Sequence, residues 1–490
     1  MTGRFQRTLG SLTVILASVA GCGRLAAPAT TSNQLTTLTV GFGLPTGADP
    51  QFGIQQLERN LALEFLLDEE ARDGRPRPWL AESWSQTPDG LTWRFRLRPS
   101  LTFHTGKPVT AEIVSAILAK DLPKNLGPAF DDVDKIRAVS DREIEFSLRR
   151  RSAFVLEGLD VPIAEPGSPL IGTGPFYVAD DKSDRVEMRA NDRYHLGKPH
   201  IDRVVIKAYA SLRAAWADML RGQVDMLYDV GMDALGSLQR SNAVKIFAFQ
   251  RAYAYTVILN VRKPYLRDAG LRRTMNAAID RQELVSQALN GHGTPALGPV
   301  WPYHWAFDPS SPGFRYQPVP VVRSGLRPLT CLIFDPSSSE RLALALQKQL
   351  QVIGIDLKLE VVSADKILER LETGDFELIL IDAAVGPGLV FPYLFWHSGG
   401  PYNWGGFSSQ RVDLALDAIR HSADDEEYKA GVAAFQRAVV EDPPAIFLAW
   451  SERARAVSRR FEVPIGSERD VLKTIRLWRP TIDQNQPPLN

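Results

Sequence analysis

This 490-residue sequence contains few residues at the spacings that are typical of catalytic or metal-binding sites. The seven histidines show no metal-ligand spacing, and His195 and His200 lie in a segment rich in glycine and proline, which favours a pair of surface side chains over a metal site. Acidic residues gather at 424–427, where the dipole of a starting helix explains them. No GxSxG elbow, phosphate-binding glycine loop or HExxH helix occurs. We therefore expect no enzyme, cofactor or metal.

What the sequence does offer is aromatic side chains in loops, which suit ligand binding. Trp301 lies in a proline-rich connection, and Trp396 and Trp404 flank Gly399-Gly400. Such rings present rigid apolar faces to a ligand, although they can equally plug the ends of a sheet. The residues expected to contact a ligand are Trp404, Tyr402, Asn403, Trp396, Trp301, Tyr253, Tyr255 and Asp382.

The first residues predict export. Two arginines precede an apolar run at 9–20 that is too short to cross a bilayer, the arrangement of a secretory signal. The run ends in Val-Ala-Gly-Cys22, which resembles the bacterial lipobox, and the alternative is an ordinary signal that contains a cysteine. Residues 1–22 would then be the signal and 23–38 a tether. Lipidation of Cys22 would anchor the protein to a membrane, facing the periplasm or the cell exterior.

Charge, cysteine content and length limit the possible partners, disulfides and number of domains. Lysine plus arginine and aspartate plus glutamate both number 57, without a long block of one sign, so no nucleic-acid partner is expected. Besides Cys22 only Cys331 remains, which excludes an internal disulfide in the exported protein. The length exceeds what one hydrophobic core usually supports and predicts two or three domains.

Hydrophobic periodicity predicts the elements that would position these residues. The stretch 255–281 reads as strand, turn and helix, with Asp268 as an N-cap and Asp280 with Glu283 as a capping box for a second helix. Between 329 and 381 strands and helices alternate, which predicts an α/β lobe on a parallel sheet. A last strand is predicted at Val471–Trp478.

Several motifs resemble one family. Leu80 to Val114 contains a tryptophan, an Asp-Gly turn, an alternating strand and then Phe-His and an alanine-acid helix start. Further matching segments follow in order: Gly172-Thr-Gly-Pro175, Asn191 to Pro199, Gly222-Gln-Val-Asp225, Pro264 to Arg281, Leu350 to Ile355, and Asn403 to Asp413. The sequence in these segments resembles the family 5 extracellular solute-binding proteins, the peptide- and nickel-type substrate-binding subunits of bacterial ABC importers.

The resemblance implies an α/β, two-lobed, periplasmic-binding-protein-like fold of type II with an extra subdomain in the first lobe. Lobe I would comprise 39–255 and 451–490, with 79–166 as the extra subdomain, and lobe II would comprise 256–450. A monomer would close on a small organic ligand, with oligopeptide the commonest answer in the family, and present it to ABC permease subunits.

One departure affects the expected ligand. Peptide-binding members usually follow the strand matching 376–381 with a tryptophan and aspartates, one of which meets the α-amino group of the peptide. Here Asp382 is followed by Ala-Ala-Val-Gly-Pro-Gly, without that tryptophan. The alternatives are therefore an oligosaccharide, a nickel chelate or an opine-like molecule, or a sensor or interaction lipoprotein on the same fold that does not transport.

Overall fold

The computed structural model describes residues 35–43, 50–68, 73–182, 184–231, 235, 238–320, 327–334, 339–464 and 470–481. Contacts divide the chain into residues 1–35 and 36–490, and the second unit is the one described below. Cys22, the predicted signal and most of the tether lie outside the described residues. In the described part of the chain, no helix has both the length and the apolar character needed to cross a membrane.

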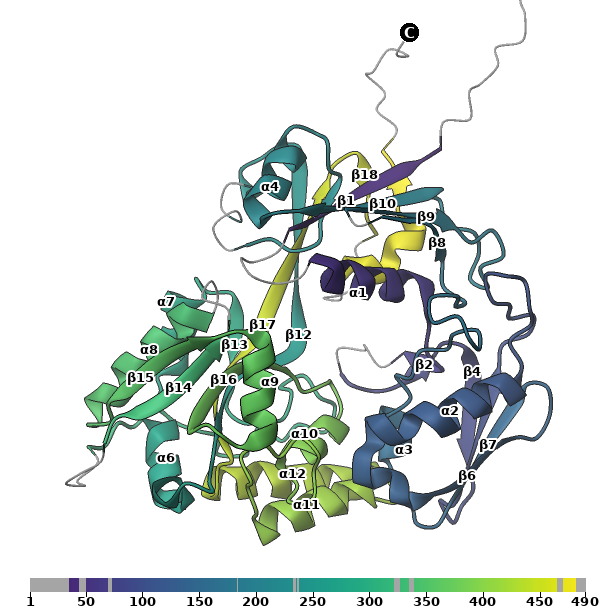
Figure 1. The fold of residues 1–490 in the computed structure, drawn as a ribbon. Helices are drawn as coiled ribbons and strands as arrows, with labels where there is room; N and C mark the ends of the chain where they lie inside the picture. Colours follow the sequence, from purple (N-terminus) through teal and green to yellow (C-terminus); the bar gives the residue numbers. More distant parts are fainter. Residues whose placement is uncertain are drawn as a thin grey trace, which may run out of the picture. The chain divides into compact units, whose positions relative to one another are not determined.

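An eleven-stranded sheet forms the centre of the fold (Figure 1), in the order β15-β14-β16-β12-β17-β11-β1-β10-β9-β8, with β13 beside β17. Its strands are β1 (Thr37–Gly43), β8 (Phe176–Lys182), β9 (Arg185–Ala190), β10 (Arg203–Tyr209), β11 (Met226–Leu227), β12 (Val244–Leu259), β13 (Gly293–Pro295), β14 (Leu329–Phe334), β15 (Leu357–Val362), β16 (Leu378–Ala384) and β17 (Ala445–Ser458). β14 runs parallel to β15 and β16, as the alternating pattern predicts.

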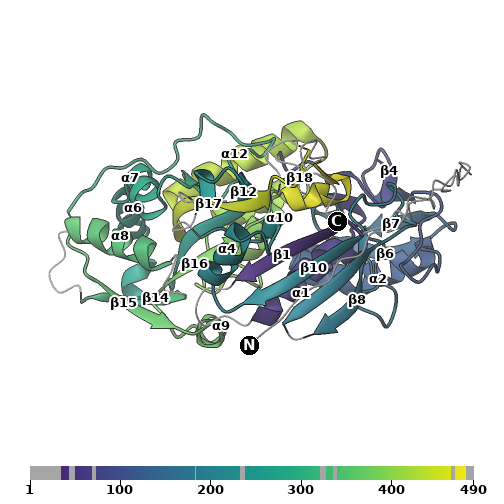
Figure 2. The same cartoon turned by 90° about the horizontal axis from the view of Figure 1, so that it is seen from above.

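The two longest strands, β12 and β17, join the two halves of this sheet. They pair antiparallel from Val244 opposite Ser458 to Ile258 opposite Ala445. Figure 2 shows them side by side, between β14 to β16 on one side and β1 and β10 on the other. Any movement of one half against the other must therefore twist or bend these two strands.

In the half that contains β1 and β10, short helices cover the sheet. They are α1 (Pro50–Ala62), α4 (Leu212–Leu220) and the 3-10 helix η3 (Val471–Leu477), and a small hairpin adds β18 (Phe461–Glu462) and β19 (Arg479–Pro480). The predicted strand at 471–478 is wrong. Val471, Leu472 and Ile475 are buried at helical spacing, and Asp470 accepts a hydrogen bond from the amide of Leu472 at the start of η3.

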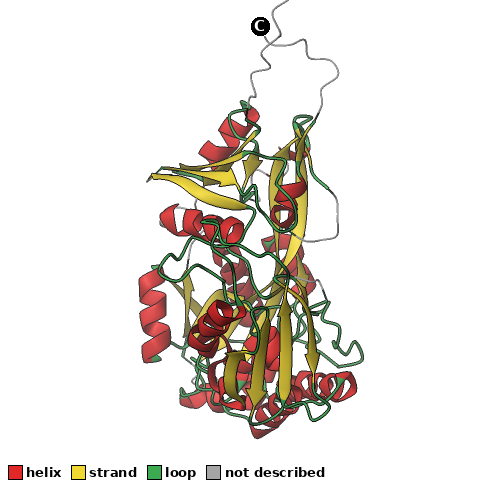
Figure 3. Ribbon diagram, turned by 90° about the vertical axis from the view of Figure 1, so that its right-hand side faces the viewer, coloured by secondary structure: helices red, strands yellow, loops and turns green. Residues whose placement is uncertain are grey.

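The other half carries helices on both sides of its strands, as Figure 3 shows in red and yellow. They are η2 (Pro264–Arg267), α6 (Ala269–Ala277), α7 (Arg281–Ala288), α8 (Ser339–Val352), α9 (Ala364–Thr373), α10 (Val390–Trp396), α11 (Gln410–Arg420) and α12 (Asp425–Glu441). The predicted N-caps are confirmed, but the capping box at Asp280 is only half formed, because Asp280 N donates to Gln349 Oε1 and not to Glu283. Asp268 accepts from Gly270 N at 2.7 Å, Asp280 accepts from Glu283 N at 2.9 Å, and Asp424 caps α12.

Residues 79–166 build a separate four-stranded antiparallel sheet, in the order β4-β5-β7-β6. Its elements are β4 (Ala81–Gln86), β5 (Thr92–Leu97), α2 (Ala111–Leu126), η1 (Gly127–Asp132), β6 (Val133–Ala138), β7 (Glu143–Leu148) and α3 (Phe154–Glu157), and the pair β2 (Leu67–Asp68) and β3 (Arg77–Pro78) precedes it. Trp93, Phe95 and Leu97 of β5 are buried while Arg94 and Arg96 are exposed, which confirms the predicted alternation.

A buried carboxylate explains two of the sequence motifs. Glu64 accepts hydrogen bonds from Thr173 Oγ1 and Tyr194 OH, both at 2.7 Å, and from Trp79 Nε1 at 2.8 Å. His195 Nε2 lies 3.0 Å from the same carboxylate, so the prediction that His195 is a surface residue is wrong, whereas His200 is exposed. A buried carboxylate needs several donors, and the Gly172–Pro175 turn and the Asn191–Pro199 stretch supply them.

Candidate functional site

Charged side chains gather where β12, β16 and β17 meet. Arg453 of β17 lies between two carboxylates, with Nη1 3.2 Å from Asp229 Oδ2 and Nη2 3.3 Å from Asp382 Oδ2. Arg251 of β12 places Nη1 3.7 Å from the same oxygen of Asp382, and its guanidinium lies 3.5 Å from the centre of the Tyr253 ring. We call Asp229, Arg251, Asp382 and Arg453 the crossing cluster.

The backbone at the crossing cluster is irregular. The register of β12 against β17 shifts between Gln250 and Ala254, so β12 carries extra residues opposite a shorter stretch of β17. Arg251 and Tyr253 are two of these extra residues. The irregularity interrupts the regular backbone pairing of the two long strands. The side chains at this point can therefore reach the crossing cluster.

The crossing cluster is balanced in charge and alters nearby pKa values. The carboxylate of Asp229 is the largest influence on Arg453 and raises its pKa. Burial, together with the neighbouring carboxylate of Asp382, raises the pKa of Tyr255 to about 12, so this phenol stays neutral. Two guanidinium groups thus face two carboxylates, and neither sign is left in excess.

Three buried polar atoms around this crossing lack hydrogen-bond partners among the described residues. They are Oδ1 of Asp382, Oε1 of Gln250 and Oγ of Ser451. Gln250 uses its Nε2 to donate to Thr294 Oγ1 at 2.8 Å, so its carbonyl oxygen is the group left over. A buried polar atom without a partner costs about 1–3 kcal/mol. Such atoms are expected where a bound molecule completes the hydrogen bonding.

Two of the predicted aromatic contacts lie in the apolar core. Trp301 is 5% exposed and packs edge-on against Trp450, with ring centres 5.0 Å apart. Trp396 is 4% exposed and packs edge-on against Phe447 at 5.6 Å. Both rings therefore pack in the apolar core against residues of β17. Core packing is the role that the sequence left open as an alternative.

The loop after α10 is more accessible. Tyr402 and Trp404 are half-buried, and each has its ring centre 5.5 Å from that of Phe395. Asn403 between them organises the loop, because its amide nitrogen donates to Phe407 O at 2.6 Å and its oxygen accepts from Phe407 N at 2.8 Å. Asn403 is therefore committed to backbone contacts.

The structure does not bring all the predicted contacts together. Ala254 packs in the apolar cluster that contains Trp301 and Trp396, whereas its neighbour Tyr255 packs in a different cluster. Successive residues of a strand point to opposite faces of a sheet. Among the predicted residues, only Asp382 belongs to the crossing cluster, and Tyr253 and Tyr255 lie beside it.

The sequence analysis missed Asp229, Arg251 and Arg453. The available signal was in β17, where the apolar run Ala445 to Trp450 continues as Ser-Glu-Arg-Ala-Arg. Arginines inside a long strand need buried or half-buried acceptors. Their partners, Asp229 and Asp382, are distant in sequence. The sequence of β17 therefore indicates that acceptors are needed, but it does not identify which residues they are.

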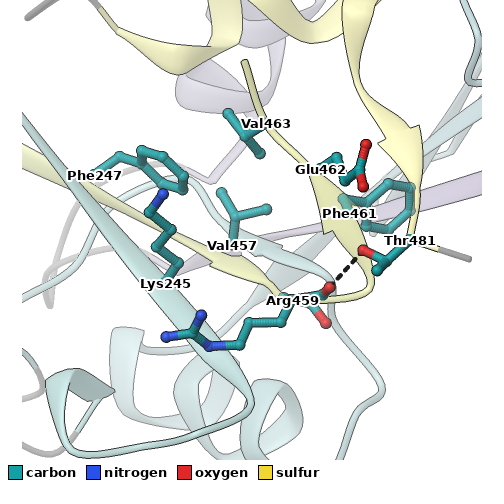
Figure 4. A pocket seen from close by; sticks show the side chains of 9 residues that line it. Lys245, Phe247, Val457, Arg459, Phe461, Glu462, Val463 and Thr481 are labelled. Carbon is teal, nitrogen blue, oxygen red and sulfur yellow. Dashed lines mark hydrogen bonds between the residues drawn. The ribbon is translucent and has the colours of Figure 1, made fainter. Parts of the chain in front are cut away.

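A separate pocket lies at the far ends of β12 and β17 (Figure 4). It has a volume of about 270 Å³ and is lined by Phe247, Val457, Phe461 and Val463, with Lys245 and Arg459 among its polar residues. The Thr481 hydroxyl donates to the backbone oxygen of Arg459 at 2.7 Å beside it. None of its lining residues belongs to the crossing cluster.

Comparison with known proteins identifies the family. A model described as bacterial extracellular solute-binding proteins, family 5 Middle, matches residues 75–403. The oligopeptide-binding protein AppA of Bacillus subtilis (strain 168) is 24% identical over 456 residues, covering 81% of this chain and 83% of that protein.

Solved structures give the same fold. AppA from Bacillus subtilis in complex with a nonapeptide has a TM-score of 0.74 at 21% identity, covering 91% of this chain and 98% of that one. NikZ from Campylobacter jejuni in complex with Ni(L-His) also has a TM-score of 0.74, at 20% identity, covering 91% and 99%. The two-lobed α/β architecture is thus confirmed. With a family match over more than half of its length, the chain belongs to the family 5 bacterial extracellular solute-binding proteins.

Proposed function

We propose that this protein is the substrate-binding subunit of an ABC importer and captures a small organic ligand, with an oligopeptide as the first candidate, at the crossing cluster. The observation that carries this proposal is the set of unpartnered buried atoms on Asp382, Gln250 and Ser451. These residues lie on β16, β12 and β17, of which β12 and β17 join the two halves of the sheet and β16 pairs with β12. A ligand held there would contact both halves.

The mechanism is closure of two lobes. Lobe I comprises 39–255 and 451–490, with 79–166 as its extra subdomain, and lobe II comprises 256–450. Because β12 and β17 are shared, they form the hinge, and ligand held between the lobes favours the closed form that a permease would recognise. Tyr253 and Tyr255 would border the ligand, whereas Tyr402 and Trp404 would lie apart from it, because their rings pack against the apolar cluster that does not contain Tyr255.

A non-peptide ligand is the second candidate, and the charge balance of the crossing cluster favours it. The α-amino group of a free peptide needs a carboxylate that is not already neutralised, but Arg453 engages both Asp229 and Asp382. An oligosaccharide, a nickel chelate or an opine-like molecule would place fewer demands on these acids. A sensor or interaction lipoprotein that does not transport remains the third reading.

Native mass spectrometry of the purified protein, combined with small-angle scattering, tests the proposal. We expect a retained small molecule, whose mass distinguishes a peptide from a sugar or a chelate. Its removal should increase the radius of gyration, and adding it back should restore the compact form. A scattering curve that does not respond to removal or return of that molecule would rule out capture by closure.

The lipid anchor is a separate proposal that rests on the lipobox-like segment ending at Cys22. We expect Cys22→Ala to move the protein from the membrane fraction to the soluble fraction, because the variant cannot carry the acyl chains that hold it. Fractionation of cells followed by immunoblotting measures this. The buried Cys331 offers the control, since Cys331→Ala should leave the protein at the membrane. Unchanged membrane association of Cys22→Ala would contradict the anchor.

A further inference from the structure

The extra subdomain contacts α10 and α12 through one glutamate. Oε2 of Glu157, at the end of α3, accepts hydrogen bonds from the amides of Leu389 at 2.6 Å and Val390 at 2.9 Å, where α10 begins. Its Oε1 accepts from Tyr428 OH of α12 at 2.5 Å. Burial raises the pKa of Glu157, and these three donors oppose that shift. A single side chain thus ties the start of α10 to the extra subdomain.

A buried ion pair joins the same two regions beside it. Nε of Arg420, at the end of α11, lies 2.6 Å from Oδ2 of Asp132 in η1, and both side chains are almost fully buried. Arg420 also donates to Pro128 O at 3.2 Å, and its backbone oxygen accepts from Ala153 N at 2.8 Å. The contact therefore includes backbone as well as side chains from both regions.

Close apolar packing completes this contact. The rings of Phe154 and Tyr393 meet edge-on at 5.5 Å. Gly127, with φ of 52°, comes so near to α10 that a Cβ there would lie 2.7 Å from a methyl carbon of Leu394. The apolar cluster of the extra subdomain is continuous with that around α10 to α12, whereas β1, α1 and η3 pack in another cluster.

We propose that the contact of η1 and α3 with α10, α11 and α12, centred on Glu157, is a latch that holds this protein closed in the absence of ligand. The inference rests on the proposed function, because only a protein that opens and closes needs a latch. If the extra subdomain belongs to lobe I, then opening must separate these surfaces. The latch and the crossing cluster then hold the lobes together at two different places.

The physical consequence is a shifted equilibrium between open and closed forms. A ligand must supply the free energy that closure costs. The buried hydrogen bonds to the carboxylate of Glu157 stabilise the closed form whether or not ligand is present. They therefore reduce the free energy of closure that the ligand has to supply. Weakening the latch should open the ligand-free protein without touching any group at the crossing cluster.

Hydrogen exchange and small-angle scattering on ligand-free protein test the latch, once native mass spectrometry has shown that no small molecule remains. We expect Glu157→Gln to accelerate exchange of the Leu389 and Val390 amides by about ten- to a hundredfold, the effect of losing hydrogen bonds to a charged group. The radius of gyration of the ligand-free variant should rise as well. Tyr428→Phe, which removes one donor and keeps the ring, should act in the same direction with a smaller effect.

Glu165→Gln is the matched control. Glu165 is also a buried glutamate, and it lies near the end of the extra subdomain (79–166). Its partners Thr105 and Lys107, both at 2.6 Å, belong to the same subdomain. This variant should leave exchange in 385–396 and the radius of gyration unchanged.

Two results would overturn the latch. One is an unchanged radius of gyration in Glu157→Gln despite faster exchange, which would mean that the extra subdomain moves together with α10 to α12. The other is an equal expansion of Glu165→Gln. Since these measurements need no ligand, a failure of the latch is distinguishable from a failure of ligand capture, which native mass spectrometry and ligand-dependent compaction report.

Discussion

Arg453→Ala is expected to abolish ligand capture and to lower the free energy of unfolding by about 1–3 kcal/mol. The reason is electrostatic: the variant removes the guanidinium that bridges Asp229 and Asp382, and the two carboxylates no longer share a cation. The Arg453 side chain is 31% exposed, so solvent screens part of this effect and the stability loss stays moderate. Native mass spectrometry reports the retained ligand, and denaturant titration reports the stability.

Arg460→Ala is the matched control for that experiment. Arg460 also pairs with an aspartate, Asp225, but this pair lies beyond the far end of β17, away from the crossing cluster. We expect Arg460→Ala to reduce stability without loss of ligand. Retention of ligand by Arg453→Ala at the wild-type level would place the ligand somewhere other than the crossing cluster.

Arg420→Ala is expected to have the larger effect on stability, about 3–5 kcal/mol, because it takes the buried cation away from a buried carboxylate. The Arg150 side chain still pairs with Asp132 at 3.0 Å, but it is 59% exposed and replaces little of that interaction. Arg420 and Asp132 are only 6% and 1% exposed, and Arg420 also lies 2.7 Å from the Tyr393 hydroxyl. Denaturant titration measures the loss. Arg411→Ala provides the comparison on the same helix, since the Arg411–Glu441 pair is exposed and should contribute about 0–1 kcal/mol. Similar losses in both variants would contradict the assigned role of burial.

The same pair predicts a dependence on pH. Burial alone would raise the pKa of Asp132, but hydrogen bonding with His421, Arg420 and Arg150 outweighs it and lowers the pKa from 3.8 to about 2. A carboxyl whose pKa is lowered in the folded state stabilises the protein above its unfolded pKa. We therefore expect about 2 kcal/mol from Asp132 to be present above pH 4 and lost as the pH falls toward 2. Arg420→Ala should show a shallower acid loss in denaturant titrations at successive pH values.

Local sequence patterns predicted much of the fold, because several elements depend on neighbouring residues. Asp268 and Asp280 cap their helices through amides two and three residues away, so the signal and the contact share one window of sequence. The run Val471 to Trp478 was misjudged because a short apolar segment has no periodicity that separates a strand from a 3-10 helix. Family motifs then supplied the two-lobed architecture that local patterns do not contain.

The candidate site was harder to predict because it depends on residues far apart in the chain. Arg453 meets Asp382 and Asp229 only after β17 lies beside β12 and β11. Trp301 and Trp396 carry the residue type expected of a ligand contact, yet core packing uses them. The prediction that His195 lies at the surface failed for the same reason, since its partner Glu64 is far away in the sequence. Residue type alone therefore did not separate binding from packing.

The continuous core between the extra subdomain and α10 to α12 has a consequence for how the chain is made. Phe154 and Ala153 leave the ribosome long before Tyr393 and Arg420, their partners in the finished protein. Until those partners arrive, α3 exposes apolar surface, and the contacts that cover it close a long loop. The N-terminal half of the chain is thus expected to become stable only after the C-terminal half has been synthesised. A fragment that stops before α10 should be prone to aggregation.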